Sequence, residues 1–242
     1  MAFHRLKEYA RFLKSFFKTS TRLLWGMWKL TKLPQPAITI FGSARVLPSN
    51  EICQQARQLA KALAGADFSI ITGGGPGIMN AANQGAIDHL KEKHLEEFLQ
   101  GKEIISAGIG LIRLTKEVEN PFVQEHVEME HFFARKWLLV RYSVGFVVFP
   151  GGFGTIDELF EIITLVQCNR MARIPIVLVG RPYWTPFVEW IKNYTLPEGF
   201  VSSQDVSIIT MVDTVEEAVN IITKECKEIT QSMLHNEAGS HE

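Results

Sequence analysis

The chain reads Pro150-Gly151-Gly152-Phe153-Gly154-Thr155-Ile156-Asp157-Glu158 between an apolar run at 144–149 and an apolar helical pattern at 159–166. An apolar run of this length predicts a buried strand, so the chain should pass from a strand through a glycine turn into a helix. Such a helix directs backbone N–H groups and the positive end of its dipole at one place. The stretch therefore predicts an α/β fold with a site for an anion such as phosphate.

A second glycine-rich turn has the same context. Residues 68–72 predict a strand, Gly73-Gly74-Gly75-Pro76-Gly77-Ile78-Met79 follows, and a helical pattern rich in alanine comes next. Two such turns should lie side by side at the carboxyl ends of parallel strands, where α/β folds bind ligands. Neither turn contains G-x-G-x-x-G, and the chain has no G-x-x-x-x-G-K-[ST]. These absences favour a small phosphorylated ligand over a dinucleotide or the substrate of a P-loop enzyme.

Composition sets wider limits on function. With 242 residues, 46% hydrophobic, the chain is long enough to bury the core of one globular domain. A net charge of −1 argues against nucleic acid as the main partner. The three cysteines are far apart, which predicts a reduced, cytoplasmic setting, and Cys168 is interpreted as a packing residue. His126 and His131 have no third ligand nearby, so no metal site is predicted.

After Pro36 the apolar pattern alternates between short strands and helices. The strands are predicted at 37–42, 68–72, 104–109, 144–149, 174–179 and 206–211. The helices are predicted at 50–65, 77–90, 130–142, 155–167, 184–193 and 214–228. This alternation predicts one Rossmann-like domain over 36–230, a doubly wound parallel sheet with helices on both faces. Residues 112–128 are predicted to be a loop lining the site, and 231–242 a disordered tail.

Residues 1–35 predict a basic amphipathic helix. Residues 1–33 hold eight Lys or Arg and one acid, Glu8, a formal charge of +7. Apolar side chains recur every three or four residues, and a basic stripe runs beside them. The apolar set is Phe3, Leu6, Ala10, Leu13, Phe17, Leu24 and Met27, and the basic stripe is Lys7, Arg11, Lys14, Lys18 and Arg22. Three interpretations stay open: packing on the domain or an oligomer partner, an anionic membrane surface, or a transit peptide.

Glu158 has two interpretations. Thr155-x-x-Glu158 matches a capping box, in which the threonine caps the helix and the glutamate bonds back to the first N–H group. Its position beside a loop expected to bind phosphate favours a catalytic role instead. Glu161 and Thr164 lie further along the same helix face. Asp157 should point elsewhere, because adjacent helical residues do not share a face.

Arg135 and Lys136 are candidates on the preceding predicted helix. Its aromatic neighbours indicate burial, and a buried guanidinium is costly unless it meets an anion. The anion is either a ligand or a structural salt-bridge partner. Ser43 and Arg45 follow the first predicted strand, where they either reach the same rim of the sheet or form a turn or a helix cap.

Together these motifs resemble the Lonely Guy (LOG) family of nucleoside 5′-monophosphate phosphoribohydrolases, whose members are often labelled lysine decarboxylases. The resemblance rests on Thr72-Gly73-Gly74-Gly75-Pro76-Gly77-Ile78-Met79, on Arg135-Lys136 and on the stretch from Pro150 to Glu158. It extends from about Ala37 to Leu196. The basic N-terminal helix lies outside it and looks like the extension of longer members.

The resemblance implies hydrolysis of the N-glycosidic bond of a purine nucleoside 5′-monophosphate, AMP or a cytokinin type, to free base and ribose 5-phosphate. It implies no cofactor, at least a homodimer, and Arg135 and Glu158 as the catalytic pair. The substrate-binding residues expected from the loops and the resemblance are Ser43, Gly74, Gly75, Met79, Glu117, Lys136, Gly151, Gly152, Gly154, Thr155 and Thr164.

Two other functions compete with this one. The first is a carrier that binds a nucleotide or phosphorylated cofactor on the same fold without turnover, which has no need of both Arg135 and Glu158. The second is a scaffold at a membrane surface, held there by residues 1–33, with an idle domain.

Overall fold

The computed structural model describes residues 2–93, 95–101, 103–112 and 120–238. Within them, seven parallel strands form one sheet in the order β4-β3-β2-β1-β5-β6-β7. The strands are β1 Ala37–Phe41, β2 Ser69–Thr72, β3 Ser106–Leu111, β4 Glu125–Met129, β5 Gly145–Val148, β6 Ile176–Val179 and β7 Ile209–Val212. The strand order reverses between β1 and β5, so the loops after these strands flank the crevice where doubly wound sheets bind ligands.

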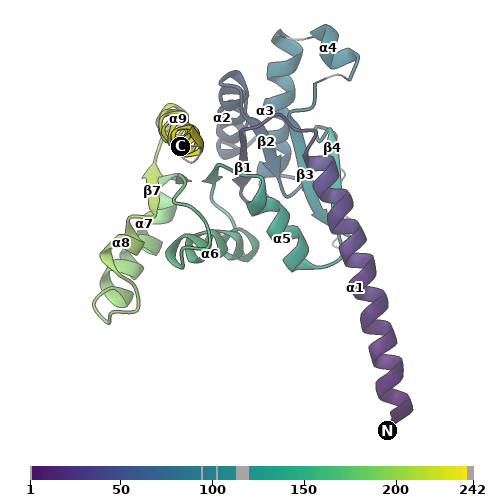
Figure 1. The fold of residues 1–242 in the computed structure, drawn as a ribbon. Coiled ribbons are helices and arrows are strands. Elements are labelled where there is room, and N and C mark those ends of the chain that lie inside the picture. The colour runs from purple at the N-terminus through teal and green to yellow at the C-terminus, as the bar shows by residue number, and fades with distance from the viewer. Residues whose placement is uncertain (1, 94, 102, 113–119, 239–242) are drawn as a thin grey trace.

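Helices cover both faces of the sheet (Figure 1). They are α1 Ala2–Leu30, α2 Glu51–Gly65, α3 Ile78–Lys93, α4 Leu95–Leu99, α5 Phe132–Arg141, α6 Phe153–Gln167, α7 Arg181–Trp190, the π-helix η1 Ile191–Thr195, α8 Ser203–Val206 and α9 Val215–Ala238. One apolar core joins the sheet to α2, α3 and α9, and the other joins it to α5, α6 and the end of α1. The predicted Rossmann-like doubly wound fold is confirmed.

The alternation of side chains along β1 shows how the sheet supplies both cores. Ile38 and Ile40 belong to the core under α2 and α3, whereas Ala37 and Phe41 belong to the core under α5 and α6. All five residues of the strand are buried, since both faces of a central parallel strand are covered.

The prediction of a loop over 112–128 was wrong at its C-terminal end, where β4 forms the edge of the sheet. Its residues alternate between buried and exposed, as expected for an edge strand. Two of the three buried positions are apolar, Val127 and Met129, while the third is Glu125. Because one buried position is a glutamate, a search for runs of apolar residues does not detect this strand.

Two helix predictions and the prediction of a disordered tail also need correction. The helix predicted at 155–167 begins two residues earlier, at Phe153, and the one predicted at 184–193 begins at Arg181 and continues as η1 to Thr195. The tail predicted to be disordered from Gln231 is helical to Ala238. Neither Gly nor Pro interrupts the segment before residue 239, so its residues are compatible with continued helix.

Candidate active site

A buried ion pair joins α5 to α6. Arg135 Nη1 lies 2.9 Å from Glu158 Oε1, and Arg135 Nε donates a 2.8 Å hydrogen bond to the backbone oxygen of Ile109 in β3. The side chains are 16% and 7% exposed, respectively. A desolvated guanidinium and carboxylate are tolerated only when they satisfy one another in this way. The anion that the sequence required for Arg135 is therefore Glu158.

Charges around the pair act on Glu158 in opposite directions. Burial raises its pKa, while the positive charges of Arg135 and Lys136 oppose the rise. Burial alone would lower the pKa of Lys136, but 2.8 Å contacts with both Asp157 and Glu161 outweigh it and raise that pKa. Lys136 is therefore a fixed positive charge beside a carboxylate whose protonation is shifted to higher pH.

The capping-box interpretation of Glu158 was wrong. Gly152 is the N-cap of α6, and Thr155 lies buried inside the first turn rather than before the helix. Glu158 is too far along the helix to reach the first N–H group, and its carboxylate points to Arg135 instead. Placing the helix start two residues too late produced the error.

The loop after β2 is tightly packed against this pair. A Cβ built on Gly73 would lie 2.4 Å from Arg135 Nη2 and 2.8 Å from the sulfur of Met79. Gly77 has φ +67° and would meet the backbone oxygen of Ser43 at 2.4 Å, so this turn needs glycine for both conformation and space. The Gly73–Gly77 loop thus forms a wall directly beside the guanidinium.

Buried asparagines that the sequence analysis missed hold this wall in place. Thr72 Oγ1 donates to Asn83 Oδ1 (2.7 Å) and accepts the N–H of Gly74 (3.0 Å). Asn120 Nδ2 donates to the same Asn83 oxygen (3.0 Å) and to the backbone oxygen of Gly75 (3.3 Å). Asn83 and Asn120 are almost fully buried. An asparagine at a core position of the alanine-rich helix was the signal available for Asn83.

The loop after β5 is open. A Cβ on Gly152 or Gly154 would meet no atom of the described residues within 4 Å, and Phe153 between them is exposed. No side chain of the described residues caps α6 at Gly152. Because the first N–H groups of a helix have no acceptor within it, this turn presents donors and positive dipole outward.

Ser43 and Thr155 support the base of the open loop. Ser43 N donates to the backbone oxygen of Pro150 (3.1 Å), and a Cβ on Gly151 would collide with Thr155 Oγ1. Tyr183, which the sequence analysis did not select, donates its hydroxyl to the backbone oxygen of Gly151 (2.5 Å). Ser43 Oγ accepts the N–H of Arg45, so it also forms the turn that was the alternative interpretation.

Most of the expected site residues thus gather at the carboxyl ends of the central strands. The ion pair, Lys136, Met79 and the two glycine loops are linked by the contacts above. Thr164 is exposed, and its hydroxyl donates to the backbone oxygen of Phe160 (2.7 Å). Glu117 lies outside the described residues.

Sequence comparisons identify relatives of this chain. Residues 79–222 match the family model described as "Possible lysine decarboxylase", and residues 35–93 match the SLOG cluster4 family. A pyrimidine/purine nucleotide 5′-monophosphate nucleosidase of Escherichia coli K12 is 30% identical over 52% of this chain. The match spans only 27% of that protein's length. A probable cytokinin riboside 5′-monophosphate phosphoribohydrolase of rice, LOGL3, is 28% identical over 67% of this chain and 71% of its own length.

Solved structures share the fold. The molybdenum cofactor carrier protein of Chlamydomonas reinhardtii aligns with a TM-score of 0.53 and 20% identity, covering 78% of this chain and 98% of that one. The molybdenum cofactor binding protein of Rippkaea orientalis aligns with a TM-score of 0.51 and 18% identity, covering 83% and 98%. At these identities the likeness concerns the fold alone.

Proposed function

The chain belongs to the family described as possible lysine decarboxylases, the LOG family, and on that premise we propose that it hydrolyses the N-glycosidic bond of nucleoside 5′-monophosphates. The observation that carries the proposal is the buried Arg135–Glu158 pair between a packed glycine loop and an open one. The nucleotide substrates in the names of the E. coli and rice relatives support the same reaction. A purine base, adenine or an N6-modified adenine, is our expectation for this chain.

The open N-terminal turn of α6 would bind the 5′-phosphate through its backbone N–H groups. Glu158 lies four residues beyond Gly154, about 6 Å along the helix axis, a distance on the scale of a ribose 5-phosphate. A carboxylate at that distance is suited to stabilise an oxocarbenium-like C1′ and to accept a proton from the attacking water. The water oxygen bonds to C1′ as the C1′–N bond breaks, and Glu158 accepts one water proton. The leaving nitrogen takes up one proton from solvent and Glu158 returns its proton to solvent, which gives ribose 5-phosphate and the neutral base.

Arg135 and Lys136 have separate roles in this proposal. Arg135 fixes the Glu158 carboxylate and presents its remaining guanidinium edge beside Gly73. Lys136, together with Arg135, opposes the rise in the pKa of Glu158 that burial causes, and so favours the ionised carboxylate. The free energy of phosphate binding then serves to orient C1′ relative to Glu158.

Lysine decarboxylation does not fit these residues. Such chemistry needs a lysine that can become neutral and form a Schiff base with pyridoxal phosphate. Lys136, the lysine beside the ion pair, is held by two carboxylates that raise its pKa. The environment of Lys136 thus favours a permanent charge over a nucleophilic amine.

A carrier of a phosphorylated cofactor is the second candidate, and the fold shared with molybdenum cofactor carriers favours it. Binding alone has no use for a buried carboxylate with a raised pKa beside the ligand site. That is why hydrolysis is the first proposal.

The test is incubation of the purified protein with AMP, other nucleoside monophosphates and isopentenyladenosine monophosphate, with base and ribose 5-phosphate measured by chromatography. Release of both products supports hydrolysis, and the preferred nucleotide gives the base specificity. Binding of nucleotides without release from any of them would support the carrier instead.

We also expect at least a homodimer. The helix α5, which carries Arg135, exposes Phe132, Phe133 and Trp137, an aromatic set typical of interfaces. Light scattering coupled to size-exclusion chromatography should give at least twice the chain mass, and a monomer would contradict this expectation.

A further inference from the structure

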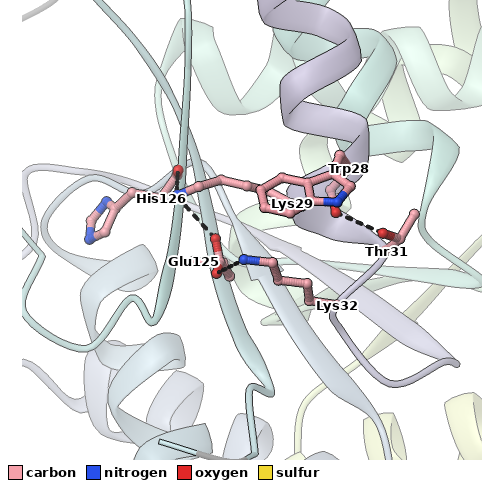
Figure 2. Close-up of polar contacts among 6 residues, drawn as sticks. All are labelled: Trp28, Lys29, Thr31, Lys32, Glu125 and His126. Atoms are coloured by element: carbon pink, nitrogen blue, oxygen red, sulfur yellow. Dashed lines mark hydrogen bonds and ion pairs between the residues drawn. The ribbon is translucent and has the colours of Figure 1, made fainter.

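The C-terminal half of α1 is fixed to the edge of the sheet. Lys29 and Lys32 converge on the buried Glu125 at the start of β4, with Nζ–carboxylate distances of 3.1 and 3.2 Å (Figure 2). Lys29 Nζ also donates to the backbone oxygen of His126 (2.9 Å). The C-terminal end of α1 and the residues just after it therefore contact the amino end of the edge strand.

Contacts nearer the N-terminus lie at the other end of β4. Lys18 pairs with Glu130, and Ser15 Oγ is 3.3 Å from His131 Nε2, just past the last residue of the strand. The helix thus runs antiparallel to β4, and its first turns project beyond the domain (Figure 1). Ten residues, 5–14, extend about 15 Å past Ser15 at the helical rise per residue.

The helix presents different faces to the domain and to solvent. Thr19, Gly26 and Leu30 are buried against the domain, and a Cβ on Gly26 would collide with Met129 and Val127. About 140° around the helix, four large apolar side chains form a strip that the domain does not cover. This strip consists of Leu13, Phe17, Leu24 and Trp28, which are 50%, 64%, 65% and 59% exposed.

Positive charge borders the strip. Arg11, Lys14 and Arg22 lie on the adjoining face, next to Lys18, which pairs with Glu130. Residues 1–33 carry +7, against −8 for residues 34–242, given a total of −1, and Lys29 and Lys32 within this charge are paired with Glu125. Pairing two copies of α1 through their strips would bring these basic side chains together, with one acid per helix to offset them. An anionic bilayer instead matches both properties, the apolar strip and its basic border.

We infer that α1 binds the surface of membranes that contain anionic lipids. The helix lies in the interface with the strip of Leu13, Phe17, Leu24 and Trp28 among the acyl chains, and the domain sits on the opposite face of the helix. Binding at the surface does not require a helix that crosses the bilayer. None of the helices of the described residues is both long and apolar enough to cross one. The inference does not depend on the proposed hydrolysis.

Flotation of the full-length protein with vesicles tests this inference. Vesicles of phosphatidylcholine alone are compared with vesicles containing about one third phosphatidylserine. We expect binding to the anionic vesicles, weak binding to the neutral ones, and release by high salt. The double variant F17D/L24D should lower binding by at least about tenfold, since each buried apolar side chain contributes roughly that factor.

The matched control is Y194D/F200D, which introduces the same charge at two exposed aromatic positions away from α1. It should bind like the wild type, and circular dichroism should show that both variants fold. Failure of the wild type to bind anionic vesicles, or equal loss in both variants, would overturn the inference. Unchanged vesicle binding by F17D/L24D, with loss of an oligomer in light scattering, would overturn it in favour of a second copy of the chain.

Discussion

The two glycine loops share a context in the sequence but differ in how much space they leave. In the loop after β2, added side-chain atoms would collide with Arg135 at Gly73 and with the backbone of Ser43 at Gly77. In the loop after β5, Gly152 and Gly154 face open space. Glycine serves close packing in the first loop and at Gly151, whereas Gly152 and Gly154 leave the second loop accessible to a ligand.

The difference assigns separate tasks to the two loops. The packed loop, held by Asn83 and Asn120, positions the guanidinium that fixes Glu158. The open loop supplies uncapped N–H groups on the same helix as Glu158. Changes in the packed loop should therefore act on turnover and stability, and changes in the open loop on substrate binding.

The ion pair between the loops should show the largest effect. Glu158→Gln and Arg135→Ala should each lower the rate of base release from AMP by about a thousandfold, within the range for loss of a catalytic acid–base group. Gln keeps an oxygen acceptor for Arg135, so Glu158→Gln should retain the native circular dichroism spectrum. Both variants keeping most of their activity would end the assignment of this pair.

Gly73→Ala should lower kcat by roughly tenfold to a hundredfold with KM nearly unchanged, because the methyl group displaces the Arg135 guanidinium. The flexible side chains of Arg135 and Met79 can move aside, so the fold should survive. Gly65→Ala is the control, since its Cβ makes only ordinary contacts of 3.6 Å with His89. Equal kcat values for the two variants would show that the packed loop does not position the pair.

The next largest effect should be a difference in folding stability between variants of the two loops. Gly77→Ala places a side chain at positive φ against backbone atoms and should cost about 1–3 kcal/mol of folding free energy. Gly154→Ala should change stability by less than about 0.5 kcal/mol, because its methyl group enters open space in the first turn of a helix. It should instead raise KM for AMP. Urea unfolding of both variants provides the measurement, and equal losses would refute the distinction.

The smallest effect concerns pH. Since burial raises the pKa of Glu158 and the reaction needs its carboxylate, activity should decline on acidification at a higher pH than an exposed glutamate would give. Lys136 opposes this rise, so Lys136→Met should shift the acid limb of kcat/KM to still higher pH. An acid limb that stays in place in Lys136→Met would show that Lys136 does not act on Glu158.

The regular part of the fold could be predicted from sequence because central parallel strands are apolar on both faces. The strand β4 could not, since its buried Glu125 is neutralised by Lys29 of α1 and by Lys32 of the turn after it, more than 90 residues away in the chain. A local pattern contains no information about such a distant partner.

In the site, too, local sequence patterns predicted some features, while others depend on contacts between distant residues. Local glycine patterns predicted both loops, and apolar context predicted that Arg135 is buried against an anion. The identity of that anion, and the link between Asn83 and Asn120 across 37 residues, depend on tertiary contacts. The misplaced helix start kept the capping-box interpretation of Glu158 open, which shows how a shift of two residues can suggest a structural role for a candidate catalytic residue.

The most direct test asks whether the open loop binds the 5′-phosphate. It compares the rates of adenine release from AMP and from adenosine, measured on one preparation of the full-length protein. If the open loop binds the 5′-phosphate and so orients C1′ at Glu158, AMP should be cleaved and adenosine should react at least about a thousandfold more slowly. Equal rates for the two compounds would contradict the account, because the open loop would then have no part in catalysis.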